Sequence, residues 1–393
     1  MNKESTINHG ESRAHALLSP SSSHRWLVCT PSARLEDPIE NVGSSASEEG
    51  TVAHELAEYA LTEYLKGNYC PLLDELPTPA EIKESKYYSS EMDKYVTDYV
   101  CYVVDMYERK ENASMAIEQK FDLTSYVPEC FGSCDCSIVS PKMLDIIDLK
   151  YGKGVKVEAK DNSQLMMYAL GVLRSLSPKM QTEIETVRMH IAQVRLGHFA
   201  VFEMSSRDLT HWGIHVLRPT AEKAFAGKGD CVVGSHCKFC RFKPQCRAQK
   251  DALVAEFEEH GPTKALTLDE IGDLLKKADI FTDWLSSVKQ YAMQASLEGK
   301  TVKGWKLVEG RSVRTITDEE EAVKRLSELG FDEDSLKNHK LKGIGDLEKM
   351  VGRKPLAVTL DGILIKPSGA PTLALEDDPR EAITPTIDLF DKI

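Results

Sequence analysis

The sequence predicts an α/β protein in which a mixed central sheet is flanked by helices and followed by a mainly helical C-terminal region. Two short apolar runs, residues 131–139 and 143–150, are separated by Ser140-Pro141-Lys142 and predict the strands of a hairpin. Residues 187–204 predict two more strands around a central Gly197. We therefore expect a sheet of about four or five strands.

Helical periodicity and composition divide the rest of the chain. Residues 91–111 and 266–297 each predict a long helix. A length of 393 residues leaves room for about two or three domains. We expect a flexible N-terminus (1–16), a main body (17–250), a helical and then small α/β C-terminal region (251–366) and a disordered tail (367–393).

The composition is that of an ordinary soluble protein, with 41% hydrophobic and 28% charged residues. A secretory signal and a run of about 20 apolar residues are both missing, so we expect a cytoplasmic protein without membrane contact. The net charge of −13 counts against a broadly basic DNA-binding surface, although DNA binding needs only a local basic stripe. Without a Gly-x4-Gly-Lys-Ser/Thr loop, a helicase or ATPase is disfavoured.

The triplet Asp148-Leu149-Lys150 ends the predicted hairpin and carries the strongest chemical signal. Residues two apart on a strand share a face, so the Asp148 and Lys150 side chains project together. Carboxylates hold Mg²⁺ or Mn²⁺ through oxygen, and a lysine beside them can position or help to deprotonate an attacking water. Alone, such a triplet is common on solvated strand faces. Whether it is catalytic therefore depends on the residues around it.

Further polar residues that could take part in catalysis lie before and after this triplet. Asp135 lies on the first strand of the hairpin. His54 falls in the first turn of a helix predicted to begin near Thr51, where a histidine is ordinarily a surface or capping residue. Gln164 and Tyr168 are four apart after the helix start signal Asp161-Asn162-Ser163, and would alone be an ordinary polar edge of an amphipathic helix.

In this order the pieces resemble the RecB-type branch of the PD-(D/E)XK nuclease superfamily. The family pattern is Gly-x-x-x-His on a helix, Gly-x-x-Asp, Asp-x-Lys before a glycine-containing turn, and Gln-x-x-x-Tyr on a helix. The matching positions here are Gly50 to His54, Gly132 to Asp135, Asp148 to Lys150 before Gly152 and Gly154, and Gln164 to Tyr168.

The resemblance implies a restriction-endonuclease-like fold and a set of roles. It implies Mg²⁺ or Mn²⁺ ligation by His54, Asp135, Asp148 and the backbone carbonyl of Leu149. It also implies catalytic roles for Asp135, Asp148, Lys150, Gln164 and Tyr168, with Lys150 as the catalytic lysine and the last two orienting the lysine or the DNA backbone. Such proteins often carry a further acidic strand residue, at the place of Glu118 here.

The implied activity is hydrolysis of a DNA phosphodiester by metal-activated water. The resemblance favours an exonuclease that acts on DNA ends in phage-type recombination or repair. It implies DNA as substrate, a single-strand annealing or binding protein as partner, and the cytoplasm of a bacterial host as location. Other classes stay open: a catalytically silent DNA-binding or structural module of the same fold, and a zinc-stapled regulatory protein.

The ten cysteines supply a second, independent signal. Cysteines clustered in a reducing cytoplasm indicate a metal site rather than disulfides. Four of them follow the spacing Cys-x5-Cys-x2-Cys-x5-Cys: Cys231, Cys237, Cys240 and Cys246. Read locally, this spacing predicts a four-cysteine zinc site.

The segment from Leu18 to Pro31 resembles the opening of AddB-like and CRISPR-adaptation nucleases. In those proteins an early cysteine and a late Cys-x2-Cys-x5-Cys bind a [4Fe–4S] cluster. The matching residues are Cys29, Cys237, Cys240 and Cys246, with Cys231 as an alternative ligand; Thr30 between Cys29 and Pro31 departs from the pattern. Because four thiolates suit either metal, the spacing does not choose between the cluster, zinc and a metal-free core.

Basic residues near both motifs are candidates for DNA contact. Lys153 follows the Asp148–Lys150 triplet, and Arg241 and Lys243 lie among the late cysteines. Contacts to phosphates would make DNA binding sensitive to salt. An ordinary solvated surface explains such residues equally well.

Overall fold

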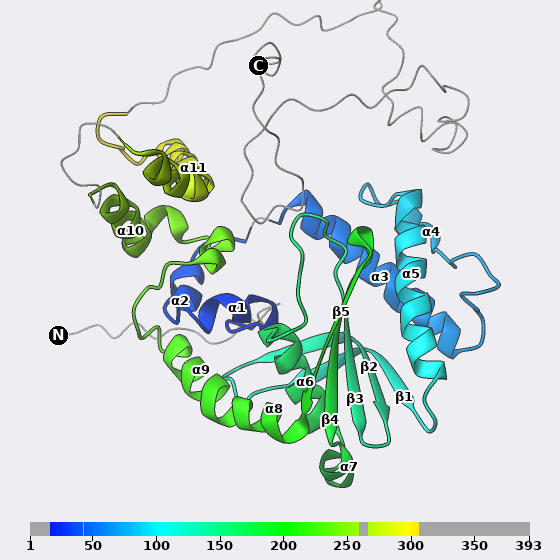
Figure 1. Ribbon diagram of the computed structural model, residues 1–393. Helices are drawn as coiled ribbons and strands as arrows, with labels where there is room; N and C mark the ends of the chain where they lie inside the picture. Colours follow the sequence, from blue (N-terminus) through cyan, green and yellow to red (C-terminus); the bar gives the residue numbers. More distant parts are fainter. Residues whose placement is uncertain (1–15, 42, 259–265, 306–393) are drawn as a thin grey trace, which may run out of the picture. The chain divides into compact units, whose positions relative to one another are not determined.

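Five strands form one sheet in the order β1-β2-β3-β4-β5 (Figure 1). The strands are β1 (Ser114–Asp122), β2 (Phe131–Ser140), β3 (Met143–Leu149), β4 (Thr186–Gln193) and β5 (His198–Ser205). Neighbouring strands are antiparallel except β3 and β4, which are parallel. The computed structural model describes residues 16–41, 43–258 and 266–305. The prediction of an α/β protein with a mixed sheet flanked by helices is confirmed.

The predicted hairpin is formed by β2 and β3. Ser140 pairs with Met143, so Pro141 and Lys142 alone make the turn. Lys142 adopts a positive φ of 65°, which a tight two-residue turn requires. The strands predicted over residues 187–204 are also present, as β4 and β5.

A helical crossover joins the two parallel strands, as parallel pairing requires. It contains α6 (Ser163–Ser175) and α7 (Pro178–Glu183). Asn162 caps α6, since its side-chain oxygen accepts a hydrogen bond of 3.2 Å from the backbone N–H of Leu165. The predicted helix start at this point is confirmed.

The helix that carries His54 begins earlier than predicted. α3 spans Ser45–Leu65, so the predicted start near Thr51 is wrong. Its N-terminus is a capping box, in which Ser44 and Ser47 each accept the other's backbone N–H through their hydroxyls, at 3.1 and 2.9 Å. His54 therefore lies well inside the helix, where its position is fixed by the packing of α3.

Helices cover both faces of the sheet (Figure 1). α3 and α5 (Ser90–Glu108) pack on one face, and α6 on the other together with α1 (Ser23–Trp26), α8 (Ser206–Trp212) and α9 (Arg218–Phe225). Along β3, Leu144 and Ile146 join the core on the α6 side, whereas Ile147 and Leu149 join the core on the α3 side. The strand is thus buried on both faces.

Shorter elements complete the described chain. They are η1 (Pro20–Ser22), α2 (Ser32–Glu36), α4 (Ala80–Lys83), η2 (Val194–Leu196), the π-helical turn η3 (Gly213–Leu217), η4 (Ser235–Phe239), η5 (Lys243–Gln245), α10 (Arg247–Glu258) and α11 (Leu268–Leu297). The helix predicted over residues 266–297 is confirmed by α11. No helix within the described ranges is long and apolar enough to span a membrane.

The described residues fall into two units, with the boundary after Ala292. Three expectations lie outside the described residues. They concern the N-terminus up to residue 15, the small α/β element beyond residue 305, and the tail 367–393.

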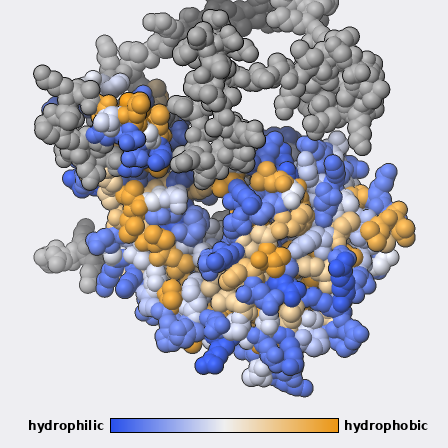
Figure 2. All heavy atoms as spheres, in the orientation of Figure 1, coloured by the Kyte–Doolittle hydropathy of each residue, from blue (hydrophilic) through white to orange (hydrophobic). Residues whose placement is uncertain are grey.

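Two groups of exposed apolar side chains mark the surface (Figure 2). One lies over the edge strand β5, where Phe199 and Val201 are exposed. The other lies on the loop between α3 and α4, where Leu72 and Leu73 are almost fully exposed. Further apolar side chains are visible at α11, where Leu275 and Ile280 are exposed.

Candidate metal and catalytic site

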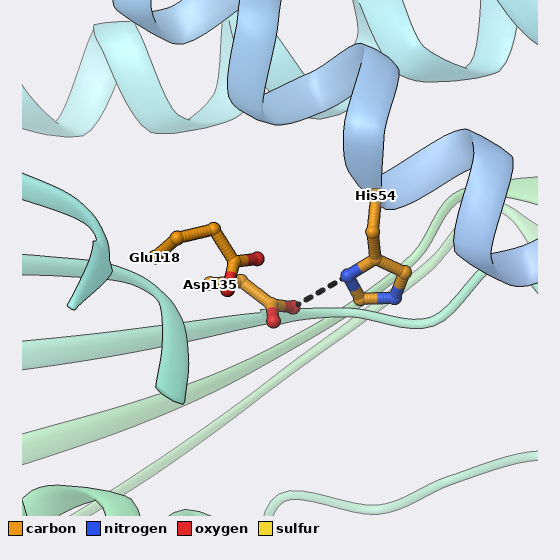
Figure 3. A group of neighbouring side chains, drawn as sticks. All are labelled: His54, Glu118 and Asp135. Carbon is orange, nitrogen blue, oxygen red and sulfur yellow. Dashed lines mark ion pairs between the residues drawn. The ribbon is translucent and has the colours of Figure 1, made fainter. Parts of the chain in front are cut away.

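Three ligand-type side chains from separate elements converge between α3 and the sheet (Figure 3). His54 comes from α3, Glu118 from β1 and Asp135 from β2. One ligand atom from each lies within 4.8 Å of the others. Nδ1 of His54 is 3.4 Å from Oδ2 of Asp135. Two ligands at about 2.1 Å from one octahedral cation are about 3.0 Å apart, so this spacing fits a divalent ion.

The charges in this group are strongly coupled. Burial lowers the pKa of His54, but the carboxylates of Asp135 and Asp148 outweigh burial and raise it to about 9. Burial raises the pKa of Asp135, but His54 and Lys150 outweigh it and the pKa is lowered. The pKa of Glu118 is raised, by burial first and then by the charge of Asp135. Two carboxyl groups this close to one another favour a cation between them.

A second group of polar side chains forms a hydrogen-bonded chain on the α6 side of the sheet. Nζ of Lys150 lies 2.9 Å from Oδ2 of Asp148 and donates to Oε1 of Gln164 at 3.1 Å. Nε2 of Gln164 lies 3.3 Å from Oδ1 of Asp148 and 2.7 Å from the hydroxyl of Tyr168. Asp148 and Lys150 thus lie on the same side of the sheet, and Gln164 and Tyr168 lie on the same face of α6, as predicted.

Burial and neighbouring charges oppose one another in this hydrogen-bonded group as well. The pKa of Asp148 is raised, because burial and the nearby Asp135 outweigh the favourable charge of Lys150. Burial lowers the pKa of Lys150, but the Asp148 carboxylate outweighs it and the pKa is raised. The pKa of Tyr168 is raised by burial and then by the charges of Asp148 and Asp135. Lys150 is thus a partly buried ammonium held by a carboxylate and an amide oxygen.

The backbone of Leu149 links the two groups. Its N–H donates to Oδ2 of Asp135 at 2.7 Å, the same oxygen that faces His54. The structure therefore brings together every side chain of the expected site, in two adjacent groups. Within the part of the chain that is described, Asp148 is not a member of the closest ligand group, and Glu118 is. Asp148 is instead engaged by Lys150 and Gln164.

Glu118 has a strained backbone. Its φ is 44°, in the left-handed region that a non-glycine residue on a strand rarely adopts. Such strain persists where the surrounding structure imposes it, and it is common at functional sites. The strained residue is the one whose carboxylate lies beside His54 and Asp135. The resemblance marked this position, but the local sequence carries no signal for the strain.

A small cavity of about 10 Å³ lies beside the His54 group, and about this much room suits one water molecule. Its lining includes Tyr99 of α5, a residue that the sequence did not single out. Tyr99 is 1% exposed and occupies a position on the apolar face of α5. Because large aromatic residues at helical spacing ordinarily form core, periodicity alone gave no reason to select it.

The loop after Lys150 is held by one buried side chain, Gln193 at the end of β4. Nε2 of Gln193 donates to the carbonyls of Gly152 and Val155, each at 2.8 Å, and its Oε1 accepts from the N–H of Val157 at 3.0 Å. Lys153, predicted to contact DNA, is exposed on this loop. Gln193 therefore shapes the loop that presents Lys153 beside the site.

Replacing Gln193 with leucine is expected to lower the free energy of unfolding by about 2 kcal/mol, because three partly buried hydrogen bonds to backbone groups are lost. Urea denaturation measures this change. Gln181→Leu is the matched control, since Gln181 also donates to two carbonyls but is only partly buried, and it is expected to cost about 0.5 kcal/mol or less. Equal costs for the two variants would contradict the assigned role.

Five cysteines line a second cavity, which shares no lining residue with the cavity beside His54. They are Cys29, Cys231, Cys237, Cys240 and Cys246. Burial raises the pKa of Cys231 to about 12, together with the neighbouring Cys29 and Cys246, and burial likewise raises that of Cys240 to about 12. The structure thus places the early cysteine among the late ones, as the resemblance implied, and includes Cys231. We call these five residues the cysteine cradle.

A buried carboxylate fastens the two sides of the cysteine cradle. Oε2 of Glu36 is 2.7 Å from Nε of Arg25, and its Oε1 accepts from the N–H of Arg241 at 2.7 Å. Arg241 also donates to the carbonyl of Ile39 at 2.8 Å. Glu36 is 3% exposed, so this is a desolvated clamp between α2 and the late cysteine segment.

The predicted DNA contacts Arg241 and Lys243 are both engaged within the protein. Arg241 belongs to the Glu36 clamp, and Nζ of Lys243 pairs with Asp283 at 2.6 Å. Of the three predicted DNA-contact residues, Lys153 alone is exposed and has no ion pair among the described residues. Arg241 and Lys243 therefore have a structural role that the sequence did not reveal.

The site can now be compared with known proteins. A family model described as protein of unknown function, DUF2800, matches residues 15–381. Among solved structures, one titled "Crystal structure of SSO0001" shares 12% identity with this chain. The match covers 56% of this chain and 95% of that one, with a TM-score of 0.22, which is too low to support an argument.

Proposed function

This chain belongs to the DUF2800 family, and from that premise and its own residues we propose that it is a metal-dependent DNA nuclease. The observation that carries the proposal is the linkage of the His54 group to the Asp148–Lys150–Gln164–Tyr168 chain through the N–H of Leu149. Carboxylates, a histidine and a partly buried lysine brought close together are the groups that metal-assisted phosphodiester hydrolysis uses.

The donor set suits Mg²⁺ or Mn²⁺. His54, Glu118 and Asp135 offer one nitrogen and two carboxylates, and Mn²⁺ accepts both kinds of ligand. The ion, when bound, would stabilise negative charge on the scissile phosphate and activate water. Asp148 completes the acidic surroundings of the ion, and the backbone carbonyl of Leu149 is a further candidate ligand.

The protein's own groups then orient the reactants. Lys150 is fixed between Asp148 and Gln164, so its ammonium can donate to the attacking water or to a phosphate oxygen. Tyr168 holds the amide of Gln164, and through it the lysine. A group fixed in this way loses little conformational entropy when it meets the transition state. Lys153, on the loop held by Gln193, would meet the DNA backbone.

An exonuclease that acts on DNA ends is the form of this activity that we propose. The resemblance to recombination nucleases supports this choice. The same resemblance supports a role in phage-type recombination or repair, beside a single-strand annealing or binding protein.

We further propose that the cysteine cradle holds a [4Fe–4S] cluster. A local zinc site would need only the four late cysteines, whereas Cys29 is buried at the same cavity. No carboxylate is among the described residues that line this cavity, and thiolates suit soft metal centres. The cluster would fasten the first helices to the end of the domain, in addition to the Glu36 clamp.

The test is cleavage of end-labelled linear DNA and of closed-circular DNA by anaerobically purified protein with Mg²⁺ or Mn²⁺. We expect degradation of the linear substrate alone, and no degradation when a chelator removes the ion. Cutting of the closed circle would replace the exonuclease with an endonuclease. Failure of the metal-replete protein to cut any substrate would overturn the proposed function.

A further inference from the structure

Tyr99 of α5 lines the cavity beside the candidate metal ligands and carries a buried hydroxyl whose role is not accounted for by packing. The Tyr99 ring belongs to the buried cluster between α3, α5 and the sheet. The same residue lines the small cavity with His54, Glu118 and Asp135. Tyr99 therefore belongs to the core and also borders the site.

This hydroxyl has no hydrogen-bond partner among the described residues, although its oxygen is fully buried. A buried polar group without a partner is costly and is ordinarily satisfied by water or by a ligand. The cavity has about the volume of one water molecule. A single water molecule in this cavity could therefore be the partner of the hydroxyl.

The chemistry of the neighbours identifies the partner. Mg²⁺ and Mn²⁺ held by few protein ligands retain water in their coordination shell. Such water is a strong hydrogen-bond donor, because the cation withdraws charge from it. A neutral phenol oxygen can accept that bond. The three protein ligands beside Tyr99 leave coordination positions for water.

We propose that Tyr99 accepts a hydrogen bond from water coordinated to the divalent cation held by His54, Glu118 and Asp135, and so positions that ion. The proposal rests on the proposed function, since it uses the same metal site. It adds a residue from α5, a helix that the expected site did not include. Tyr99 acts through the hydration shell and is a positioning residue.

The test is calorimetric titration of Mn²⁺ into the purified full-length protein without DNA. We expect Tyr99→Phe to bind Mn²⁺ about threefold to tenfold more weakly than the parent, as loss of one hydrogen bond predicts. The ring is retained, so the melting temperature of the metal-free variant should equal or exceed that of the parent. Binding by Tyr99→Phe as tight as that of the parent would overturn the proposal.

Tyr69→Phe is the matched control. Tyr69 is a tyrosine buried in the same cluster, but it does not line the cavity. Its removal is expected to leave Mn²⁺ binding unchanged, and an equal loss in both variants would refute a specific role for Tyr99. His54→Ala is expected to remove binding.

The failures can be told apart. If the parent binds no Mn²⁺, the metal site and the role of Tyr99 are both refuted. If binding follows the expected order and DNA is still not cleaved, the proposed nuclease function fails and the role of Tyr99 stands.

Discussion

Replacement of Asp148 by asparagine is expected to reduce DNA cleavage by about a hundredfold to a thousandfold or more, with the protein still folded. Asparagine keeps the shape of the side chain and removes the charge that holds Lys150 and complements the cation. The measurement is the rate of degradation of end-labelled linear DNA, together with the circular dichroism spectrum. Retained cleavage would show that the assigned site is wrong.

The same strand offers a matched control. Asp145 is a second fully buried carboxylate of β3, paired with Lys110 and His190 on the opposite face of the sheet. Asp145→Asn is expected to lower stability, because it leaves a buried lysine without its partner, but to retain cleavage below its melting temperature. Loss of cleavage in both variants would point to general damage to the strand.

The second large effect concerns the cysteine cradle. Cys237→Ser is expected to lower the iron and sulfide content and to lower the melting temperature by roughly 10 °C, because a bound metal centre stabilises the folded state alone. Metal and sulfide analysis and thermal unfolding measure both quantities on one preparation. Zinc in place of iron would replace the proposed cluster with a zinc site.

Cys101→Ser controls for the loss of a thiol as such. Cys101 is a partly buried cysteine of α5 that does not line the cradle. It is expected to change neither metal content nor melting temperature by more than a small amount. If Cys237→Ser behaved in the same way, the cradle would have no structural metal.

Local patterns predicted much of the fold. The β2–β3 hairpin and α6 were foreseen because a two-residue turn and an Asn162 cap act on neighbouring residues. The start of α3 was misplaced by six residues, although the Ser44–Ser47 pair that caps it is visible in the sequence. Thr51 resembles a cap but lies inside the helix, where its hydroxyl donates to the carbonyl of Ser47.

The sequence predicted which residues form the candidate site, but it did not predict which of them contact one another. The order of the motifs selected His54, Asp135 and Lys150, and the structure places them together. Tyr99 and Gln193 could not be selected, because a core aromatic and a strand-end glutamine acquire their roles only when distant elements pack. Asp148 and Glu118 illustrate the same limit, since Asp148 is engaged by Lys150 and Gln164 whereas Glu118 lies beside His54.

The cysteine cradle affects the order in which the protein folds during its synthesis. Cys29 and Cys246 are 217 positions apart, and the residues of the candidate site all lie between them. On the ribosome, β1, β2 and β3 can pair as soon as they emerge, whereas Glu36 and Cys29 must wait for Arg241 and Cys246. The first helices are therefore fastened last, and a truncated nascent chain lacks the closure that the finished protein has.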